Sequence, residues 1–393
     1  MKFDFPSFLF SLFRSLLLLY LTVHVSSGFA FGQAPSGADT SNDDSSQSWT
    51  ATTQQQLPSN LNPIRTSETH TQNDGRTLDN QSIQALGTDR HYSPYLDVQK
   101  ETVKVDANTV RTVERSFGRD SDGRKTLVQV TEEEKSSLPG GEVKVTRSTS
   151  DPDANGTLRV VQREVQDARQ ISPTVTETKS TVLTPSSNGG LTASLQSTER
   201  ETKTSDHNVQ FRKSISLPDS NGNWQVNEVR EGTIKDDGKN RTKDESVLRP
   251  GTDGNLSVVA RTVSTELQNA AGEKRSTTET YASDPASPAD GLRLQQRVIT
   301  VDRKGDDGLQ STDKRIEQRN PGQPSDGLRV TEQAIDIVRP GAGGTTRETQ
   351  TVRSLDSNGE FGVVSVDTRK QENAPAVKVD IAPAKTLPTG QGH

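Results

Sequence analysis

The sequence predicts an all-β protein, a repetitive antiparallel meander of roughly 16–18 strands with disordered N- and C-terminal segments. An Asn-Gly or Asp-Gly pair recurs at regular intervals, two apolar columns follow each pair, and the segments between turns are rich in Thr and Val. β-branched residues in near-alternation favour strands. The alternative with the same repeat is a β-solenoid with two strands per coil.

The composition limits the kind of core that the chain can build. The 393 residues carry a net charge of −6, with 28% apolar residues, 4% aromatic residues and no cysteine. A large single-core enzyme domain would bury more aromatic area. Wholesale disorder would need a larger net charge. We therefore expect an ordered chain with a thin core, stabilised without disulfides.

Residues 1–30 are predicted to be a signal peptide. Lys2 and Arg14 accompany an apolar run centred on residues 16–21, and the small residues Gly28 and Ala30 suit a cleavage site. An uncleaved anchor is the alternative, but a span needs about 20 apolar residues and Arg14 interrupts the run. We expect a protein that is secreted or held in the periplasm or cell envelope, with no integral membrane segment after cleavage.

The remaining chain divides into three predicted segments. Residues 31–86 read as a disordered polar linker, 87–371 as a β-hairpin repeat array and 372–393 as a disordered tail. Successive turn glycines in the array lie 32–37 residues apart, at Gly123, Gly156, Gly189, Gly222, Gly254, Gly291, Gly327 and Gly359. A weaker break near mid-period divides each repeat into two strands. Asn-Gly and Asp-Gly are strong hairpin signals because both residues tolerate positive φ.

Two apolar columns follow the turn glycines. Their members are Leu158, Leu191, Trp224, Leu256, Leu292, Leu328 and Phe361, and then, two residues later, Val160, Ala193, Val226, Val258, Leu294, Val330 and Val363. Residues at i and i+2 share one face of a strand. The columns predict a stripe of core that each repeat shares with its neighbour. Helical repeats of similar period lack support, since their motifs are absent and the composition favours strands.

An outer-membrane β-barrel is a further alternative, because a signal peptide precedes many strands. Such barrels need a lipid-facing apolar band with aromatic girdles at both rims. Only seven aromatic residues fall between residues 87 and 371, which is too few for two girdles. The sequence therefore favours a meander that twists into a ribbon, folds on itself or closes outside a membrane over an outer-membrane barrel.

No catalytic, cofactor-binding or metal-ligating residue is predicted. No two of the five histidines share a metal-ligand spacing. Residues 151–156 match the opening of a calcium loop, but Gln162 stands where such a loop needs Glu. We favour a hairpin turn there, in which Asp and Asn make local hydrogen bonds. The acidic turns at 120–122 and 219–221 have the same two interpretations.

These observations favour a non-enzymatic exported structural or adhesive repeat protein that presents an extended polar β-surface. Its 47 Lys and Arg are interleaved with 53 Asp and Glu, and no basic stripe emerges, so nucleic acid is a disfavoured partner. The expected partner is an envelope or extracellular polymer, or another copy of the chain. The alternatives are a specific binder or enzyme with its site on the irregular loops near 283–289 and 320–325, and the outer-membrane β-barrel.

Overall fold

A computed structural model describes residues 47–57, 63–73, 75–269, 272–283, 291–320, 327–356 and 358–373. The predicted signal peptide at 1–30 and nearly all of the predicted tail at 372–393 lie outside these residues. No helix in the described ranges is long and apolar enough to cross a membrane.

The described chain forms strands joined by short turns. The strands are β1 (Gln47–Gln56), β2 (Ile64–Asn73), β3 (Arg76–Leu86), β4 (Tyr92–Lys104), β5 (Thr109–Arg119), β6 (Lys125–Ser137), β7 (Val143–Pro152), β8 (Leu158–Ser172), β9 (Val175–Pro185), β10 (Leu191–Ser205), β11 (Asn208–Pro218), β12 (Trp224–Asp236), β13 (Asn240–Pro250), β14 (Leu256–Gln268), β15 (Lys274–Ser283), β16 (Leu292–Lys304), β17 (Gln310–Arg319), β18 (Leu328–Pro340), β19 (Thr346–Leu355) and β20 (Phe361–Asn373). One 3-10 turn, η2 (Ala342–Gly344), joins β18 to β19.

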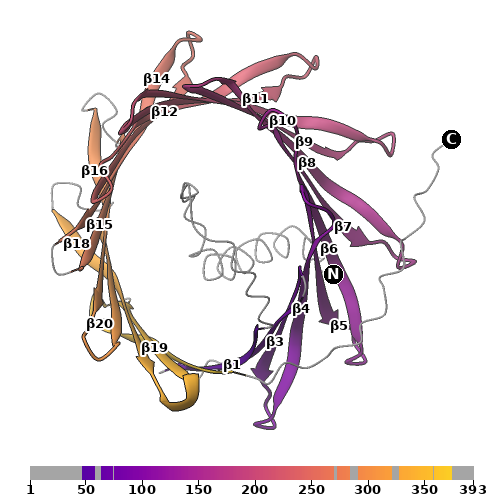
Figure 1. The fold of residues 1–393 in the computed structure, drawn as a ribbon, viewed down its shortest axis with the longest axis vertical. Coiled ribbons are helices and arrows are strands. Elements are labelled where there is room, and N and C mark those ends of the chain that lie inside the picture. The colour runs from indigo at the N-terminus through magenta and orange to yellow at the C-terminus, as the bar shows by residue number, and fades with distance from the viewer. Residues whose placement is uncertain are drawn as a thin grey trace, which may run out of the picture. The chain divides into compact units, whose positions relative to one another are not determined.

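Every strand pairs antiparallel with its neighbours in the sequence, and β20 pairs with β1. At that seam Ala51 lies opposite Gln371, and Thr52 lies opposite Lys370. The meander therefore closes into a 20-stranded barrel, which Figure 1 shows as a ring. The prediction of an all-β antiparallel meander is confirmed. The solenoid alternative is wrong, and the strand number exceeds the predicted 16–18.

The start of the array differs from the prediction. Strands β1, β2 and β3 lie within residues 31–86, which the sequence predicts to be a disordered linker. Their sequences are dominated by Thr, Gln, Ser and Asn, so they lack the apolar columns that mark the later repeats. Ladder hydrogen bonds and hydroxyl-bearing side chains order them instead, as in the antiparallel pairing of β2 with β3.

The described turns that follow odd-numbered strands, after β3, β5, β7, β9, β11, β13 and β19, share one geometry. In residues 219–223 the Asp219 N–H donates to the Asn223 carbonyl (2.8 Å), and the Gly222 N–H donates to the Asp219 carbonyl (3.0 Å). Gly222 has φ +82°, whereas Arg90 is the one non-glycine residue with positive φ in the described ranges. This is a type I turn closed by a glycine bulge, in which only the glycine takes positive φ. The turn positions are as predicted, but the turn type differs.

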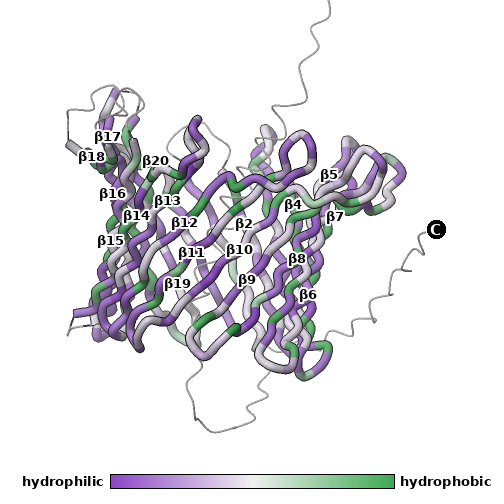
Figure 2. The backbone as a smooth tube through the Cα atoms, turned by 90° about the horizontal axis from the view of Figure 1, so that it is seen from above, coloured by the Kyte–Doolittle hydropathy of each residue, from purple (hydrophilic) through white to green (hydrophobic). Residues whose placement is uncertain are grey.

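A second bulge recurs in the even-numbered strands from β4 to β20. The register shifts by one residue immediately after the second apolar column. For example, Ser150 lies opposite Val160 but Thr149 lies opposite Gln162, so β8 holds one extra residue at this point. Bulges bend a strand and increase its twist. We attribute to them the outward flare of the hairpins on the rim away from the chain ends (Figure 1, Figure 2).

The core is thin. The buried apolar side chains in the described residues are Ala51, Ile83, Val113, Val130, Val175, Phe211 and Val229, and even these keep 2–9% of their surface exposed. The predicted columns do lie on one face of the strands, but seven of their members, among them Trp224, Leu256 and Phe361, are 37–44% exposed. The columns therefore form a half-exposed belt near the flared rim and not the expected core stripe. Figure 2 shows how short the hydrophobic segments are along the wall.

Candidate functional site

The closed sheet has an inward and an outward face, and hydrogen-bond direction assigns them. The N–H groups of Lys203 and Asp236, on even-numbered strands, donate to the preceding strand at the carbonyls of Thr174 (2.7 Å) and His207 (2.9 Å). Consider a strand that runs upward and a residue whose side chain points toward the viewer. For an L-residue in this orientation, the backbone N–H points to the viewer's right. Seen from the rim that carries the chain ends, strand number rises counterclockwise (Figure 1). Lys203 and Asp236 therefore face the lumen.

The register extends this assignment around the ring. The inward face includes Ser180, Ser197, Ile215 and Glu228, each directly opposite the next. The two apolar columns belong to the outward face, as does Arg163. The inward face is mainly polar. The outward face of the even-numbered strands mixes charged residues with apolar ones beyond the columns, such as Val263, Ile299 and Ile335.

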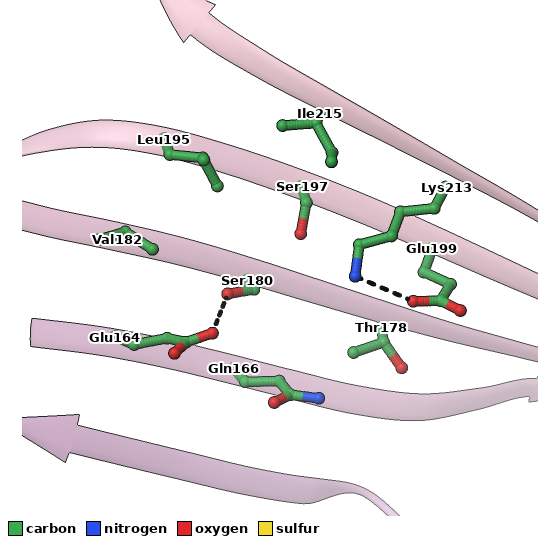
Figure 3. Close-up of a pocket in the computed structure, with 10 residues that line it drawn as sticks. All are labelled: Glu164, Gln166, Thr178, Ser180, Val182, Leu195, Ser197, Glu199, Lys213 and Ile215. Carbon is green, nitrogen blue, oxygen red and sulfur yellow. Dashed lines mark hydrogen bonds and ion pairs between the residues drawn. The ribbon is translucent and has the colours of Figure 1, made fainter. Parts of the chain in front are cut away.

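A shallow cavity lies in the inner wall across β8, β9, β10 and β11. Its volume is about 230 Å³. Ser180 donates to Glu164 (2.9 Å), and Lys213 pairs with Glu199 (3.3 Å), as Figure 3 shows. The lining residues are Glu164, Gln166, Thr178, Ser180, Val182, Leu195, Ser197, Glu199, Lys213 and Ile215. All ten are inward residues by the register, so the cavity opens into the lumen. It offers hydroxyl, amide, ammonium and carboxylate groups to the lumen.

One inward carboxylate is buried beneath paired arginines. Glu228 accepts hydrogen bonds from Arg230 Nε (2.7 Å) and from Arg249 Nη2 (2.9 Å) and Nε (3.1 Å). Phe211 lies nearby on the same face, opposite Gly232, with Lys243 Nζ 5.0 Å from its ring centroid. These contacts join β11, β12 and β13 side by side.

The suggested calcium loop is a turn. The Asp153 carboxylate accepts from the backbone N–H groups of Asn155 (2.9 Å) and Thr157 (3.0 Å) and pairs with Arg159. Asp151 instead accepts from Gln129 on the neighbouring strand (3.1 Å). The hairpin interpretation of residues 151–156 is confirmed. Within the described part of the chain, no three His, Asp or Glu side chains are grouped to hold one metal ion.

The same Asx geometry lowers the pKa of several turn carboxylates. For Asp153 and Asp219 the main cause is hydrogen bonding from backbone N–H groups. Asp237, in the β12–β13 turn, has its pKa lowered to about 2, chiefly by the side chain of Asn240 and then by backbone N–H groups of Asn240 and Lys239. Each of these carboxylates thus accepts hydrogen bonds from within its own turn.

The outward face is more basic than the linear sequence suggests. Its Lys and Arg outnumber its Asp and Glu by about two to one, whereas the inward face carries roughly equal numbers. The turns at both rims carry the compensating acids, including Asp106, Asp153, Asp219, Asp237 and Asp356. A basic wall between acidic rims is the main electrostatic feature of the described barrel.

The fold was compared with known families, sequences and structures. No protein-family model matches it, and no curated protein is similar in sequence. Similar solved structures include OccK7 (OpdD) of Pseudomonas aeruginosa, with 10% identity and a TM-score of 0.38 over 84% of this chain and 99% of that one. The FrpB iron transporter of Neisseria meningitidis has 7% identity and a TM-score of 0.43, covering 84% and 81%. A mutant Rh. blastica porin has 8% identity and a TM-score of 0.36, covering 61% and 94%.

These likenesses are too distant to carry an argument about activity, and the barrel itself rests on the strand pairing. Closure nevertheless agrees better with the predicted alternative of an outer-membrane β-barrel than with an open adhesive ribbon. That the protein is not an enzyme, and that it takes no cofactor, stay predictions.

Proposed function

We propose that the protein is an exported β-barrel of the cell envelope whose lumen is an aqueous passage for polar solutes. The observation that carries the proposal is closure of a 20-stranded meander around a polar inner face. Export follows from the predicted signal peptide.

The size of the ring supports a water-filled lumen. Strands about 4.8 Å apart and tilted by about 40° give a 20-stranded ring a backbone diameter of roughly 40 Å. Side chains from one wall cannot fill such a width, and barrels of 16–18 strands already enclose aqueous channels. Inward residues such as Thr176, Lys213 and Glu199 would be solvated there.

The outward side chains indicate how the wall meets its surroundings. A wall in hydrocarbon needs an apolar band about 25 Å tall, and each Lys or Arg near the middle costs about 2–4 kcal/mol. The belt of two columns spans only about 7 Å along a strand, at a rise of about 3.3 Å per residue. Arg163, Arg261 and Arg297 are the next outward residues, and they separate the belt from the scattered apolar residues further along the strands, such as Val263 and Ile299. We infer that most of the wall lies in water or against a polar partner.

A membrane-spanning channel is the second candidate function. One observation favours it: the strand number is even, and the first and last strands have their free ends on the same rim, as in outer-membrane barrels. On the opposite rim β15 and β17 end and β16 and β18 begin, and the sequence between these strand ends is longer than in most other turns; outer-membrane barrels likewise have their longer connections on one side.

Cysteine labelling tests whether the lumen is closed. Because the chain has no native cysteine, each variant carries a single reactive thiol. Thr176→Cys places a thiol inward and Lys179→Cys places one outward on the same strand, and both positions are exposed. A small maleimide should label both variants. A bulky poly(ethylene glycol) maleimide should label Lys179→Cys much faster. Equal rates for the bulky reagent at both sites would refute a closed lumen.

Vesicles distinguish the two candidates. The full mature chain is mixed with phospholipid vesicles that hold a polar dye, and dye release is measured for the native protein and for Lys213→Glu. A membrane channel should release the dye. If the dye is charged, its release rate should change in Lys213→Glu, which alters the lumen, but not in the control Lys179→Glu, which alters the outward face. A barrel outside the membrane should release none while retaining the labelling pattern above.

A further inference from the structure

Like charges stand directly opposite each other on the outward face near the rim of the chain ends. Arg339 on β18 lies opposite Arg347 on β19, which lies opposite Lys370 on β20. All three side chains are exposed. Directly opposed like charges destabilise a sheet. A row of three cations on adjacent strands is therefore a feature that an anionic partner would compensate.

A second such pair supports the same reading of the outer wall. Arg200 on β10 lies opposite Arg212 on β11, and both are exposed on the outward face. Of this pair, Arg212 has an acidic partner within the described residues, Glu231 at 2.8 Å, and Arg200 has none. Arg is also the commoner cation on this face, and its planar fork binds carboxylate or phosphate through two hydrogen bonds.

We propose that the outer wall binds an acidic polysaccharide, with uronate carboxylates held by the row of Arg339, Arg347 and Lys370. The row has little internal compensation, since among these three cations only Lys370 pairs with a carboxylate of the described residues, Glu372. Adjacent cations on neighbouring strands stand about 5 Å apart, close to the length of one sugar unit. A polymer lying across the strands would meet them in succession.

The surroundings of the row fit a sugar chain. The next outward positions on β19 and β20 are Thr349 and Thr368, which are directly opposite each other, and Thr52 on β1 lies opposite Lys370. Hydroxyl groups can both donate to and accept from sugar hydroxyls. None of these neighbouring outward positions is aromatic, so the stacking platforms that single-stranded nucleic acids use are missing from this part of the wall.

The acidic rims favour a flexible polymer over a lipid surface. An anionic membrane that approached the barrel end-on would meet the turn carboxylates first, such as Asp106 and Asp237 near the chain ends. A flat surface that approached from the side would touch only a narrow strip of the convex wall. A flexible polyanion can follow the curvature and reach the row while avoiding the turns.

Binding of polygalacturonate to the full mature chain tests the proposal, measured by calorimetry at low salt. Arg347→Gln should weaken binding about tenfold, and raising the salt to 0.5 M should weaken it further, because exposed charges are screened. Lys314→Gln is the matched control: it removes one positive charge from the neighbouring β17, but on the inward face. Circular dichroism of each variant verifies that the sheet is retained.

Three results would overturn the proposal: no binding of polygalacturonate, equal losses in Arg347→Gln and Lys314→Gln, or tighter binding of phosphatidylglycerol vesicles or a DNA oligonucleotide than of polygalacturonate at the same charge concentration. Neutral dextran should not bind. The inference goes beyond the aqueous passage, since it concerns the opposite face. Failure here would leave the labelling difference between Thr176→Cys and Lys179→Cys intact, so the two proposals fail separately.

Discussion

Removing the buried carboxylate of Glu228 should destabilise the barrel much more than removing an outward carboxylate from the same strand. Glu228 is 7% exposed and accepts three hydrogen bonds from Arg230 and Arg249. Glu231, also on β12, is 39% exposed and pairs with Arg212 at 2.8 Å. The two carboxylates thus differ in burial and in the number of bonds that they accept.

The expected magnitudes follow from those contacts. A hydrogen bond to a charged group contributes about 1.5–3 kcal/mol net. Because Arg230 and Arg249 are 46% and 59% exposed, they would recover water after the change. We therefore expect Glu228→Ala to lower the free energy of unfolding by about 2–3 kcal/mol. Glu231→Ala, which breaks one exposed ion pair, should cost about 0–1 kcal/mol.

The assay is urea unfolding followed by far-ultraviolet circular dichroism, with the slope against urea checked for each variant. Glu228→Gln, which keeps one carbonyl acceptor and the side-chain volume, should fall between the native protein and Glu228→Ala. Equal losses in Glu228→Ala and Glu231→Ala would show that the Arg230–Glu228–Arg249 contacts do not hold β12 to β13, and the reasoning would be wrong.

Two further predictions concern the turns. Arg90 occupies the bulge position with φ +62°, where the other turns have glycine; Arg90→Gly should raise the free energy of unfolding by about 0.5–1 kcal/mol, and Gly222→Ala should lower it by about 1–2 kcal/mol, both by urea titration. Asp237 has a pKa lowered to about 2 by its Asn240 and Lys239 partners. Its depressed pKa makes the carboxylate stabilising above about pH 4, and this contribution is lost as the pH falls toward about 2. The melting temperature of Asp237→Ala should therefore lie below that of the native protein at pH 6 and approach it at pH 2; a constant difference would contradict the assignment.

The repeat was predictable because the turn glycines carry it. Gly156 and Gly222 mark hairpins whose positions the sequence fixes well, and the apolar columns identify one face of each even-numbered strand. The first three strands were missed because β1 and β2 hold almost no apolar alternation. A usable signal was present at Asp74-Gly75, since Gly75 has φ +73° and connects β2 to β3.

Closure was not predictable from local pattern. The pairing of Ala51 with Gln371 joins residues from opposite ends of the array. Nothing in the local sequence of β1 or β20 indicates whether their edges pair with each other or are left to hydrogen-bond with water. The basic outer wall was hidden for a related reason. Inward and outward residues alternate along each strand, and the bulge in each even-numbered strand from β4 onward shifts the alternation, so that Arg339, Arg347 and Lys370 become neighbours only after the register is known.

The seam between β1 and β20 tests the closed barrel most directly. Ala51 and Gln371 lie directly opposite each other, within the distance at which two cysteines can form a disulfide. In a chain without native cysteine, Ala51→Cys/Gln371→Cys should oxidise to an intramolecular disulfide in dilute solution, detected by mass spectrometry of the linked peptides. Ala51→Cys/Ser214→Cys, which places the second thiol outward on the distant strand β11, should not. A double variant at the seam that stays reduced, or that crosslinks only between molecules, would mean that the meander is open.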